Sequence, residues 1–375
     1  MLTISLCMIV KNEENTLKRC LSSVKDVADE IIIVDTGSTD NTKQEASMFT
    51  DKIYDFRWVD DFSLARNYAF SKASKDYILW MDADDVILPG DKVRIMELKE
   101  SLLPDVDVVM MKYNTGFDSH GNVVFSYYRE RLLKRSKNYK WHEPVHEYIA
   151  ISGNIINSDA CITHAKEHGT HSSRNLRIYN DLIKKGIVLT PRGKYYYARE
   201  LKDNGKYKDA VNQFNIFLDE GSGWVEDKIS ACSEMARCYL MLGEDEKAVS
   251  SMLRSFIYDM PRAELCCQLG YYFKSKEKIK SAIFWFKTAL ELEKPETWGF
   301  IQHDFEDYIP CMELVVCYDK LGNYEKAERY NEMASLYKSD SPAVLYNRNY
   351  FAKRRIEEEG SALREGSHVT AYIPG

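Results

Sequence analysis

The chain has 375 residues, enough for two or three domains of about 150 residues each. Hydrophobic residues make up 45% of it and charged residues 29%, which is typical of a folded globular protein and excludes a disordered or collagen-like chain. The formal net charge of −7 argues against a protein that binds nucleic acid through a broad basic surface.

No stretch of the sequence approaches about 18 consecutive apolar residues, so no membrane-spanning helix is predicted. The apolar start, residues 2–10, lacks a preceding basic region and runs into Lys-Asn-Glu-Glu, which favours a first strand over a secretion signal. There are nine cysteines, an odd number, and none of them forms a C-x-x-C pair. This pattern is not that of a disulfide framework, so we expect reduced thiols in the core. A cytoplasmic protein is therefore expected.

The N-terminal region alternates between predicted strands and helices. Apolar runs predict strands at 3–10, 30–35, 52–56 and 77–81. Helical spacing lies between them at 14–23, after the turn 36–40, and at 62–73. This alternation predicts a parallel sheet with helices on both faces. Beyond Pro89 the segments 105–112 and 123–133 resemble an antiparallel hairpin.

After about residue 172 the strand signals stop and a short phrase repeats. It aligns on alanines separated by 38, 34 and 45 residues: Ala210, Ala248, Ala282 and Ala327. A turn glycine precedes three of them: Gly205, Gly243 and Gly322. A 34-residue period is typical of tetratricopeptide helix pairs, which commonly hold a peptide in a groove, and a generic helical bundle is the alternative.

An acidic cluster, Asp82-Ala83-Asp84-Asp85, follows the apolar strand 77–81. Open α/β sheets bind ligands at the carboxyl ends of their strands, and two carboxylates one residue apart can hold a hard cation such as Mg²⁺ or Mn²⁺. A solvated acidic turn and a phosphoaspartyl nucleophile are the alternatives, although the latter would typically lie on the first strand. The position after three earlier strands favours a metal-bound diphosphate.

Residues 3–165 resemble family 2 glycosyltransferases of the GT-A fold, the Rossmann-like fold of nucleotide-diphospho-sugar transferases. The resemblance rests on four motifs in the family's order: SLCMIVKNEE at 5–14, VDTGSTDNT at 34–42, DFSLARN at 61–67 and DAD at 82–84. With tetratricopeptide-like repeats behind the catalytic domain, the plan is similar to bacterial peptide S- and O-glycosyltransferases of the sublancin (glycocin) type, which modify bacteriocins.

Three regions are predicted on this basis. Residues 1–172 would form an α/β GT-A glycosyltransferase domain, and residues 173–355 an all-α domain of tetratricopeptide-like helical repeats. The tail at 356–375 has no apolar periodicity and is expected to be disordered.

The resemblance implies a donor site at the carboxyl ends of the first strands. It assigns the nucleotide sugar to Val10, Asn12, Glu13, Asp35, Arg66 and Asp82. Asp35 would face the uracil edge, and Arg66 the base or the diphosphate. The divalent metal, Mn²⁺ or Mg²⁺, would be held by Asp84 and Asp82, with His164 completing its shell. The alternatives are a helix cap for Asp35, a surface ion pair for Arg66, and a diphosphate contact or a plain polar loop for His164.

A second group of candidates lies in the segment Trp141-His-Glu-Pro-Val-His-Glu147. An inverting transfer needs a base that takes the acceptor proton. This segment resembles the place where family 2 enzymes carry their catalytic acid, so Glu147 is the predicted base, with Glu143 and His146 behind it. Trp141 would stack on the sugar or belong to the core. A loop carrying His168 and His171 could order over the bound donor, and a flexible loop is the alternative.

The predicted function is metal-dependent, inverting transfer of a hexose from a UDP-sugar to a Cys, Ser or Thr side chain of a peptide or protein held by the repeats. Two alternatives stay open. One is the same donor chemistry on a saccharide or lipid-linked acceptor in cell-surface glycan synthesis, and the other is a catalytically inactive repeat scaffold. Neither nucleic acid nor a membrane span is expected, and the sequence does not distinguish a monomer from a homodimer.

Overall fold

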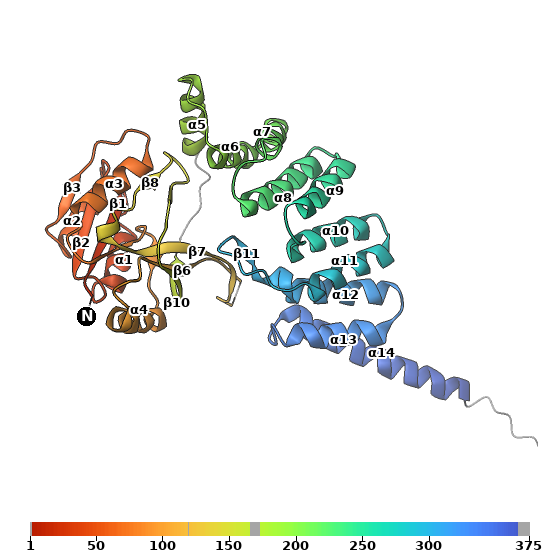
Figure 1. The fold of residues 1–375 in the computed structure, drawn as a ribbon. Helices are drawn as coiled ribbons and strands as arrows, with labels where there is room; N and C mark the ends of the chain where they lie inside the picture. The colour runs from red at the N-terminus through yellow and green to blue at the C-terminus, as the bar shows by residue number, and fades with distance from the viewer. Residues whose placement is uncertain (1, 119, 166–172, 367–375) are drawn as a thin grey trace, which may run out of the picture. The chain divides into compact units, whose positions relative to one another are not determined.

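The computed structural model of the protein describes residues 2–118, 120–165 and 173–366, with side chains through Glu357 (Figure 1). The chain forms two compact units. One comprises Met1–Ala248 with Thr297–Ile301, and the other comprises Val249–Glu296 with Gln302–Gly375. The predicted histidines His168 and His171 lie outside the described residues.

The first unit begins with a mixed sheet. Its strands are β1 (Ile4–Val10), β2 (Glu30–Asp35), β3 (Ile53–Asp55), β4 (Tyr77–Trp80), β5 (Asp85–Val86), β6 (Val108–Phe117), β7 (Val123–Lys134) and β10 (Ile155–His164). They are ordered β3-β2-β1-β4-β7-β6-β10-β5. Strand β1 is parallel to β2 and β4, whereas β7 is antiparallel to β4 and β6. Strands β8 (Trp141–His142) and β9 (Tyr148–Ile149) pair with each other in a separate ribbon. The predicted α/β fold, with an antiparallel part beyond Pro89, is confirmed.

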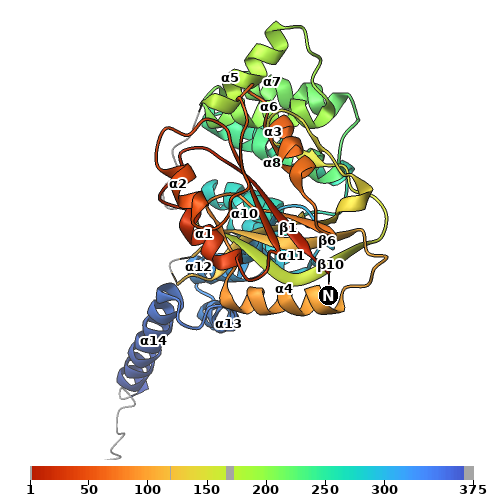
Figure 2. The same cartoon turned by 90° about the vertical axis from the view of Figure 1, so that its left-hand side faces the viewer.

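Helices cover both faces of this sheet. Alternate residues of a strand point to opposite sides, so the apolar residues of β1 need a covering helix on each side. The helices are α1 (Leu17–Val24), α2 (Thr42–Ser47), α3 (Phe62–Lys72) and α4 (Pro89–Ser101). Leu6 and Met8 of β1 pack in one cluster with residues of α1 and α4, which lie along one side of the sheet in Figure 2. Cys7 faces the other way and packs with Phe70 of α3.

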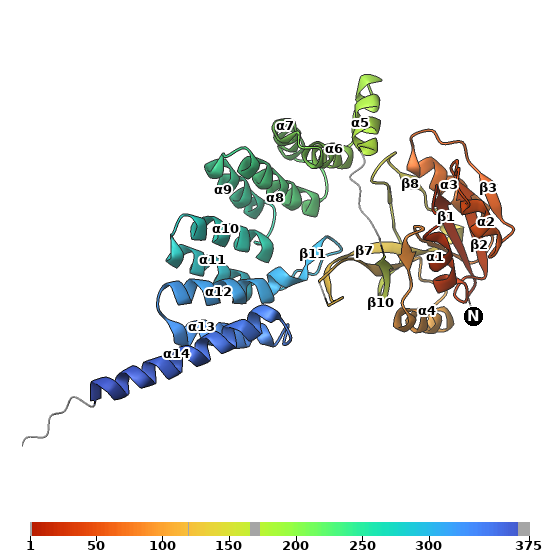
Figure 3. The ribbon, with the colours of Figure 1, turned by 180° about the vertical axis from the view of Figure 1, so that it is seen from behind.

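The rest of the described chain is helical, apart from short elements. The helices are α5 (Arg174–Lys184), α6 (Pro191–Asp203), α7 (Tyr207–Asp219), α8 (Val225–Met241), α9 (Asp245–Arg254), α10 (Ala263–Ser275), α11 (Ile279–Glu291), α12 (Tyr308–Lys320), α13 (Tyr324–Ser335) and α14 (Pro342–Gly366). The short elements are η1 (Arg135–Lys137), η2 (Ser255–Ile257), η3 (His303–Glu306) and β11 (Ile301–Gln302). In the second unit, α10–α11 and α12–α13 form successive antiparallel pairs (Figure 3). The predicted all-α character of the region behind the sheet is confirmed.

The alanines of the repeat phrase lie in the interior of the helical region. All four of the aligned alanines are fully buried: Ala210, Ala248, Ala282 and Ala327. A small side chain at this position lets two helices approach each other. The structure differs from the sequence prediction at the tail, because α14 continues to Gly366 and residues 356–366 are therefore helical. The run from Lys353 to Glu357 consists mostly of strong helix formers, which extend the preceding amphipathic turns. Residues 367–375 lie outside the described part.

The turn between α10 and α11 has a glutamate where three other repeats have glycine. Gly205, Gly243 and Gly322 have φ angles of 73°, 74° and 70°, and Glu277 has a φ of 55°. A side chain in this left-handed region costs roughly 1 kcal/mol relative to glycine. We expect Glu277→Gly to raise the free energy of unfolding by about 1 kcal/mol, less the small contribution of the exposed Lys320 ion pair, as measured by urea denaturation.

The control for this prediction is Glu277→Ala, which removes the same ion pair and keeps a Cβ atom. It is expected to be no more stable than the original protein. If both variants changed the urea midpoint equally, the backbone conformation at this turn would not be the source of the effect.

Candidate active site

The predicted donor residues gather at the carboxyl edge of β1, β2 and β4. Val10 and Asp35 are register partners at the ends of β1 and β2. Two loops continue from these strands and are tied together, since Ser38 Oγ accepts from the Asn12 backbone N–H at 2.9 Å and Asn12 Oδ1 accepts from the Thr39 backbone N–H at 2.8 Å. The structure therefore brings the segments around Asn12 and Asp35 into one rim.

Asp35 is nearly fully buried in this rim, with 1% of its surface exposed. Its Oδ1 accepts from the backbone N–H groups of Gly37 at 2.8 Å and Ser38 at 2.9 Å. Gly37 has a φ of 105°, a conformation that favours glycine and lets the turn wrap around the carboxylate. The second oxygen, Oδ2, is buried without a hydrogen-bond partner among the described residues. A buried acceptor of this kind is satisfied when a ligand supplies a donor.

Glu13 lies on the same rim, close to the acidic turn after β4. Its side chain accepts from Thr16 Oγ1 at 2.7 Å, and its backbone N–H donates to Thr42 Oγ1 at 2.6 Å. Burial, together with the negative charges of Asp84 and Asp82, raises the pKa of Glu13. Glu13, one of the predicted nucleoside residues, is therefore close enough to the acidic turn to feel its negative charge.

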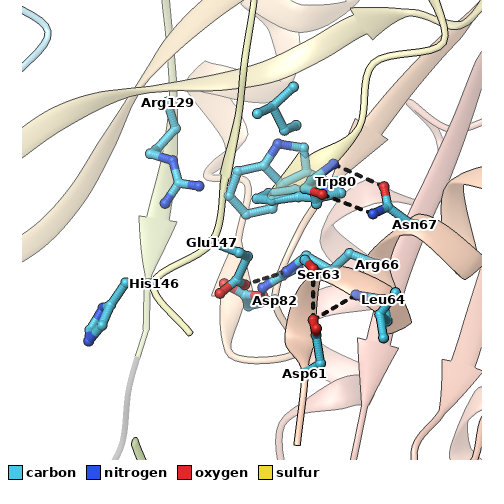
Figure 4. Close-up of polar contacts among 12 residues, drawn as sticks. Asp61, Ser63, Leu64, Arg66, Asn67, Trp80, Asp82, Arg129, His146 and Glu147 are labelled. Atoms are coloured by element: carbon cyan, nitrogen blue, oxygen red, sulfur yellow. Dashed lines mark hydrogen bonds and ion pairs between the residues drawn. The ribbon is translucent and has the colours of Figure 1, made fainter. Parts of the chain in front are cut away.

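Arg66 joins two carboxylates at the centre of the site (Figure 4). Its Nη2 contacts Asp82 Oδ1 at 2.7 Å, and its Nε donates to Glu147 Oε1 at 2.6 Å. Burial by itself would raise the pKa of Asp82, but the positive charge of Arg66 outweighs it and lowers that pKa to about 2. The guanidinium also lies 4.9 Å from the ring centre of Trp141 and 5.2 Å from that of Trp80. Arg66 is thus a buried bridge between these two carboxylates.

The local sequence of α3 explains how Arg66 reaches this place. Asp61 caps the helix, because its Oδ1 accepts from the backbone N–H of Leu64 at 3.0 Å. One turn further, the Asn67 side chain clamps the backbone of Trp141 through two hydrogen bonds of 2.9 Å. The DFSLARN motif therefore fixes the start of the helix, the bridging arginine and the strand that leads to Glu147.

The acidic turn after β4 forms a group with His164. The ligand atoms of Asp84, Asp85 and His164 all lie within 4.8 Å of one another. His164 Nδ1 is 3.5 Å from Asp84 Oδ1, and hydrogen bonds to Asp84 and then Asp85 raise the pKa of His164 to about 9. Carboxylate oxygens with one imidazole nitrogen are ligands that suit Mn²⁺, whereas sulfur ligands select softer metals. The residues present therefore fit a divalent cation.

This group differs from the predicted one at Asp82. The Asp82 carboxylate is turned to Arg66, and Asp85 stands beside Asp84 and His164 instead. The physical reason is the turn itself, in which the Asp85 backbone N–H donates to the Asp82 carbonyl at 3.0 Å and Asp85 Oδ2 accepts from the Asp82 backbone N–H at 3.0 Å. These bonds direct the two side chains to different partners.

Asp85 is itself held in a buried ion pair. Its Oδ2 lies 3.1 Å from Arg131 Nη1, and both side chains are fully buried. Its Oδ1 accepts from the Tyr113 hydroxyl at 2.6 Å, and that hydroxyl is 2.9 Å from His164 Nδ1. Because both oxygens of Asp85 are engaged, Asp84 is the carboxylate of the group that remains available to a cation.

The ion pair leads to a prediction about stability. We expect Asp85→Ala to lower the free energy of unfolding by about 3–5 kcal/mol, because it leaves the buried Arg131 uncompensated. Urea denaturation measures the loss. The double variant Asp85→Ala, Arg131→Met should recover part of it, since no buried charge is left alone. Equal losses in the single and double variants would contradict this account.

The structure separates the other two predicted catalytic residues from Glu147. Glu143 Oε1 accepts from Thr190 Oγ1 at 2.5 Å, and His146 Nε2 lies 2.7 Å from Glu200 Oε1. Figure 4 shows the His146 ring turned away from the Arg66 bridge, whereas Glu147 points into it. Trp141 is a buried core residue that packs edge-to-face on Trp80, with ring centres 4.8 Å apart.

Some residues near the site were missed by the sequence analysis. Arg129 and Arg131 of β7 both lie close to Trp80, with guanidinium carbons 4.7 Å and 3.9 Å from its ring centre. The signal was an Arg-Glu-Arg sequence inside a predicted sheet strand, where charged residues need a partner or a function. Asn67 and Tyr113 gave no such signal, because their partners are distant in the sequence.

The strand order, the acidic turn at the end of β4 and the histidine that ends β10 define a GT-A-like domain, which is followed by helical repeats. Residues 5–157 match glycosyl transferase family 2, and residues 263–295 match the tetratricopeptide repeat. The chain therefore contains a segment that matches glycosyl transferase family 2, followed by a segment that matches the tetratricopeptide repeat.

Several curated proteins are similar to the chain. A TPR repeat-containing protein of Synechococcus elongatus is 36% identical over 149 residues, which cover 40% of this chain and 36% of that protein. The SPbeta prophage-derived glycosyltransferase SunS of Bacillus subtilis is 34% identical over 238 residues, 58% of this chain and 55% of SunS. The lipopolysaccharide core biosynthesis glycosyltransferase LpsC of Rhizobium meliloti is 30% identical over 168 residues, 42% of this chain and 60% of LpsC. The chain thus spans between about a third and three fifths of these relatives.

Among the helices that the structure describes, none combines the length and the apolar character needed to cross a bilayer.

Proposed function

We propose that the protein transfers a hexose from a UDP-sugar, with inversion and with the help of a divalent metal, to a Cys, Ser or Thr side chain of a peptide or protein. The observation that supports this best is the Arg66 bridge. It joins Asp82 on the donor side to Glu147, the candidate base, through contacts of 2.7 Å and 2.6 Å. The buried guanidinium of Arg66 would therefore align Asp82, which serves the donor, with Glu147, which serves the acceptor.

The donor pocket would lie on the rim formed by Val10, Asn12, Glu13 and Asp35. Uracil presents an imide N–H, which is the donor that the unpartnered Oδ2 of Asp35 lacks. A capping role for Asp35 would not account for an acceptor that stays buried and unused. Support for a uracil nucleotide therefore comes from Oδ2 of Asp35. Asp82, held by Arg66, would face the ribose or the sugar.

Asp84 and His164 would hold the Mn²⁺ or Mg²⁺ ion, and Asp85 would fix the position of His164 through Tyr113. The ion, when bound, supplies positive charge that offsets the charge developing on the departing nucleoside diphosphate. Glu147 would take the acceptor proton, with Oε1 fixed by Arg66 and Oε2 turned to the acceptor. A thiol acceptor would need less help from this base than a hydroxyl, because thiols deprotonate nearer neutral pH.

The acceptor would be held by the tetratricopeptide repeats, since stacked helix pairs present a concave surface to a peptide. The likeness to SunS, a glycosyltransferase that matches beyond the family 2 segment, supports an acceptor of this kind. A second candidate is a saccharide or lipid-linked acceptor, which the likeness to the lipopolysaccharide core enzyme LpsC favours.

The experiment that tests the proposal measures UDP release from UDP-glucose, UDP-galactose and UDP-N-acetylglucosamine, each with Mn²⁺, with Mg²⁺ and with EDTA. Release from one sugar that requires metal is the expected result. Adding Cys- or Ser-containing peptides and, separately, oligosaccharides should accelerate release with the true acceptor class. A protein that neither released UDP nor bound Mn²⁺ and UDP together in calorimetry would be a scaffold, and the proposal would be wrong.

A further inference from the structure

The loop that delivers Glu147 to the site has an unfavourable backbone. Glu143 has a φ of 72° and His146 a φ of 54°, although neither is glycine. Such conformations persist only where the surrounding structure holds them in place. The loop itself offers little support, because Pro144 lies between the two residues and removes a backbone donor.

The support comes from α6 and the residue that caps it. Thr190 Oγ1 donates to Glu143 Oε1 at 2.5 Å, and Arg192 Nε donates to the His146 carbonyl at 3.1 Å. The ring of Tyr196 stacks on that of His146, with centres 4.2 Å apart and planes inclined by 17°. Both strained residues are thus gripped by side chains from one short segment, which we call the α6 latch: Thr190, Arg192, Tyr196 and Glu200.

Glu200 is the buried member of the latch that fixes the direction of His146. Only 7% of its surface is exposed. Its Oε1 accepts from His146 Nε2 at 2.7 Å and from Asn175 Nδ2 at 3.0 Å, so its own position is also fixed. His146 precedes Glu147 directly, and Glu147 contacts Arg66 at 2.6 Å. The orientation of one side chain is therefore transmitted through a single peptide unit to the candidate base.

We propose that Glu200 is a positioning residue for the transfer reaction, which acts by holding His146 so that Glu147 stays on Arg66. This inference rests on the proposed role of Glu147 as the base. It makes α6 part of the active site, and it gives His146 a structural role in place of the catalytic role predicted from the sequence.

The test compares three variants of the full chain. Glu200→Ala removes the acceptor for His146, whereas Glu200→Gln keeps a carbonyl oxygen at the same place. Glu234→Ala is the matched control, because Glu234 is similarly buried, with 9% exposed, and is ion-paired with Lys202 of α6 but does not contact the loop. Hydrogen–deuterium exchange of the peptide 141–149 reports the loop, and thermal melting reports overall stability.

We expect Glu200→Ala to speed exchange of the peptide 141–149 by about tenfold or more, since the strained loop loses its hold. Glu200→Gln and Glu234→Ala should exchange like the original protein, and Glu234→Ala should melt at a temperature at least as low as Glu200→Ala does. This readout does not require turnover, so it tests the latch even if the proposed function fails. Unchanged exchange in Glu200→Ala, or equal acceleration in Glu234→Ala, would overturn the inference.

A kinetic readout then separates positioning from general damage. With the UDP-sugar that the original protein uses, kcat of Glu200→Ala should fall about 10- to 100-fold while KM for that sugar changes by less than about twofold, because a displaced base leaves the donor rim intact. Glu200→Gln should restore most of kcat. A normal kcat in Glu200→Ala, or a loss of kcat that Glu200→Gln shares in full, would overturn the positioning role.

Discussion

Replacing Glu147 with glutamine is expected to lower kcat for sugar transfer by about 10²- to 10⁴-fold, the usual contribution of a general base. The variant keeps an oxygen that can accept from Arg66 Nε, so the bridge to Asp82 and the fold should persist. Turnover is measured as UDP release with saturating metal and acceptor, and UDP binding is measured by calorimetry. Binding should change little, because the donor rim does not include Glu147.

The control for this variant is Glu332→Gln in α13. Glu332 is also a carboxylate paired with an arginine, since its Oε2 lies 2.6 Å from Arg348 Nη2, but it belongs to the other unit. It should leave UDP release unchanged. If Glu147→Gln kept full activity with a hydroxyl acceptor, Glu147 would not be the base. If Glu147→Gln kept its rates only with thiol acceptors, the role of Glu147 would be confined to the deprotonation of hydroxyl acceptors.

The variant Asp84→Asn is expected to weaken Mn²⁺-dependent UDP binding by roughly 100-fold, because it removes an anionic oxygen from the candidate metal group. The backbone of Asp84 should stay in place, since its carbonyl accepts from the Ala165 N–H at 2.9 Å regardless of the side chain. Calorimetric titration of Mn²⁺ with UDP gives the affinity, and the original protein in EDTA should behave like the variant.

Asp26→Asn is a suitable control. Asp26 is a carboxylate that follows α1 and pairs with Lys92 of α4, and it is not a member of the candidate metal group. It should bind Mn²⁺ and UDP like the original protein. Unchanged metal-dependent binding in Asp84→Asn would remove Asp84 from the metal site and leave Asp85 and His164 to be tested in its place.

The fold could be predicted from the sequence because its signals are local. In β1 the apolar run is interrupted only by Ser5, and both faces of the strand are buried, as a strand covered by helices on both sides requires. The repeats were visible because each helix pair needs a small residue at the same contact, and the four alanines fill it. Residues 356–366 are helical although they carry no apolar stripe, because helix formation there follows from residue propensity.

The site was harder to predict, because neighbouring residues can point to different partners. Asp82 and Asp85 lie in one turn, and the sequence does not tell which of them stands beside His164. That choice depends on Arg131, which comes from a strand 46 residues further along the chain and pairs with Asp85. Similarly, His146 and Glu147 are adjacent, yet the positive φ of His146 turns its ring towards Glu200, 54 residues away.

Helix α6 serves two structures at once. Its Tyr195 packs against Phe214 and Phe217 of α7, with ring centres 6.3 Å and 5.7 Å away, while its Glu200 holds the loop of the transferase domain. Recombination between related proteins, natural or engineered, would therefore exchange repeats successfully only at junctions beyond α6 and α7. A chimaera joined at residue 172 would receive a foreign first helix and would need to recreate the latch before its transferase domain could work.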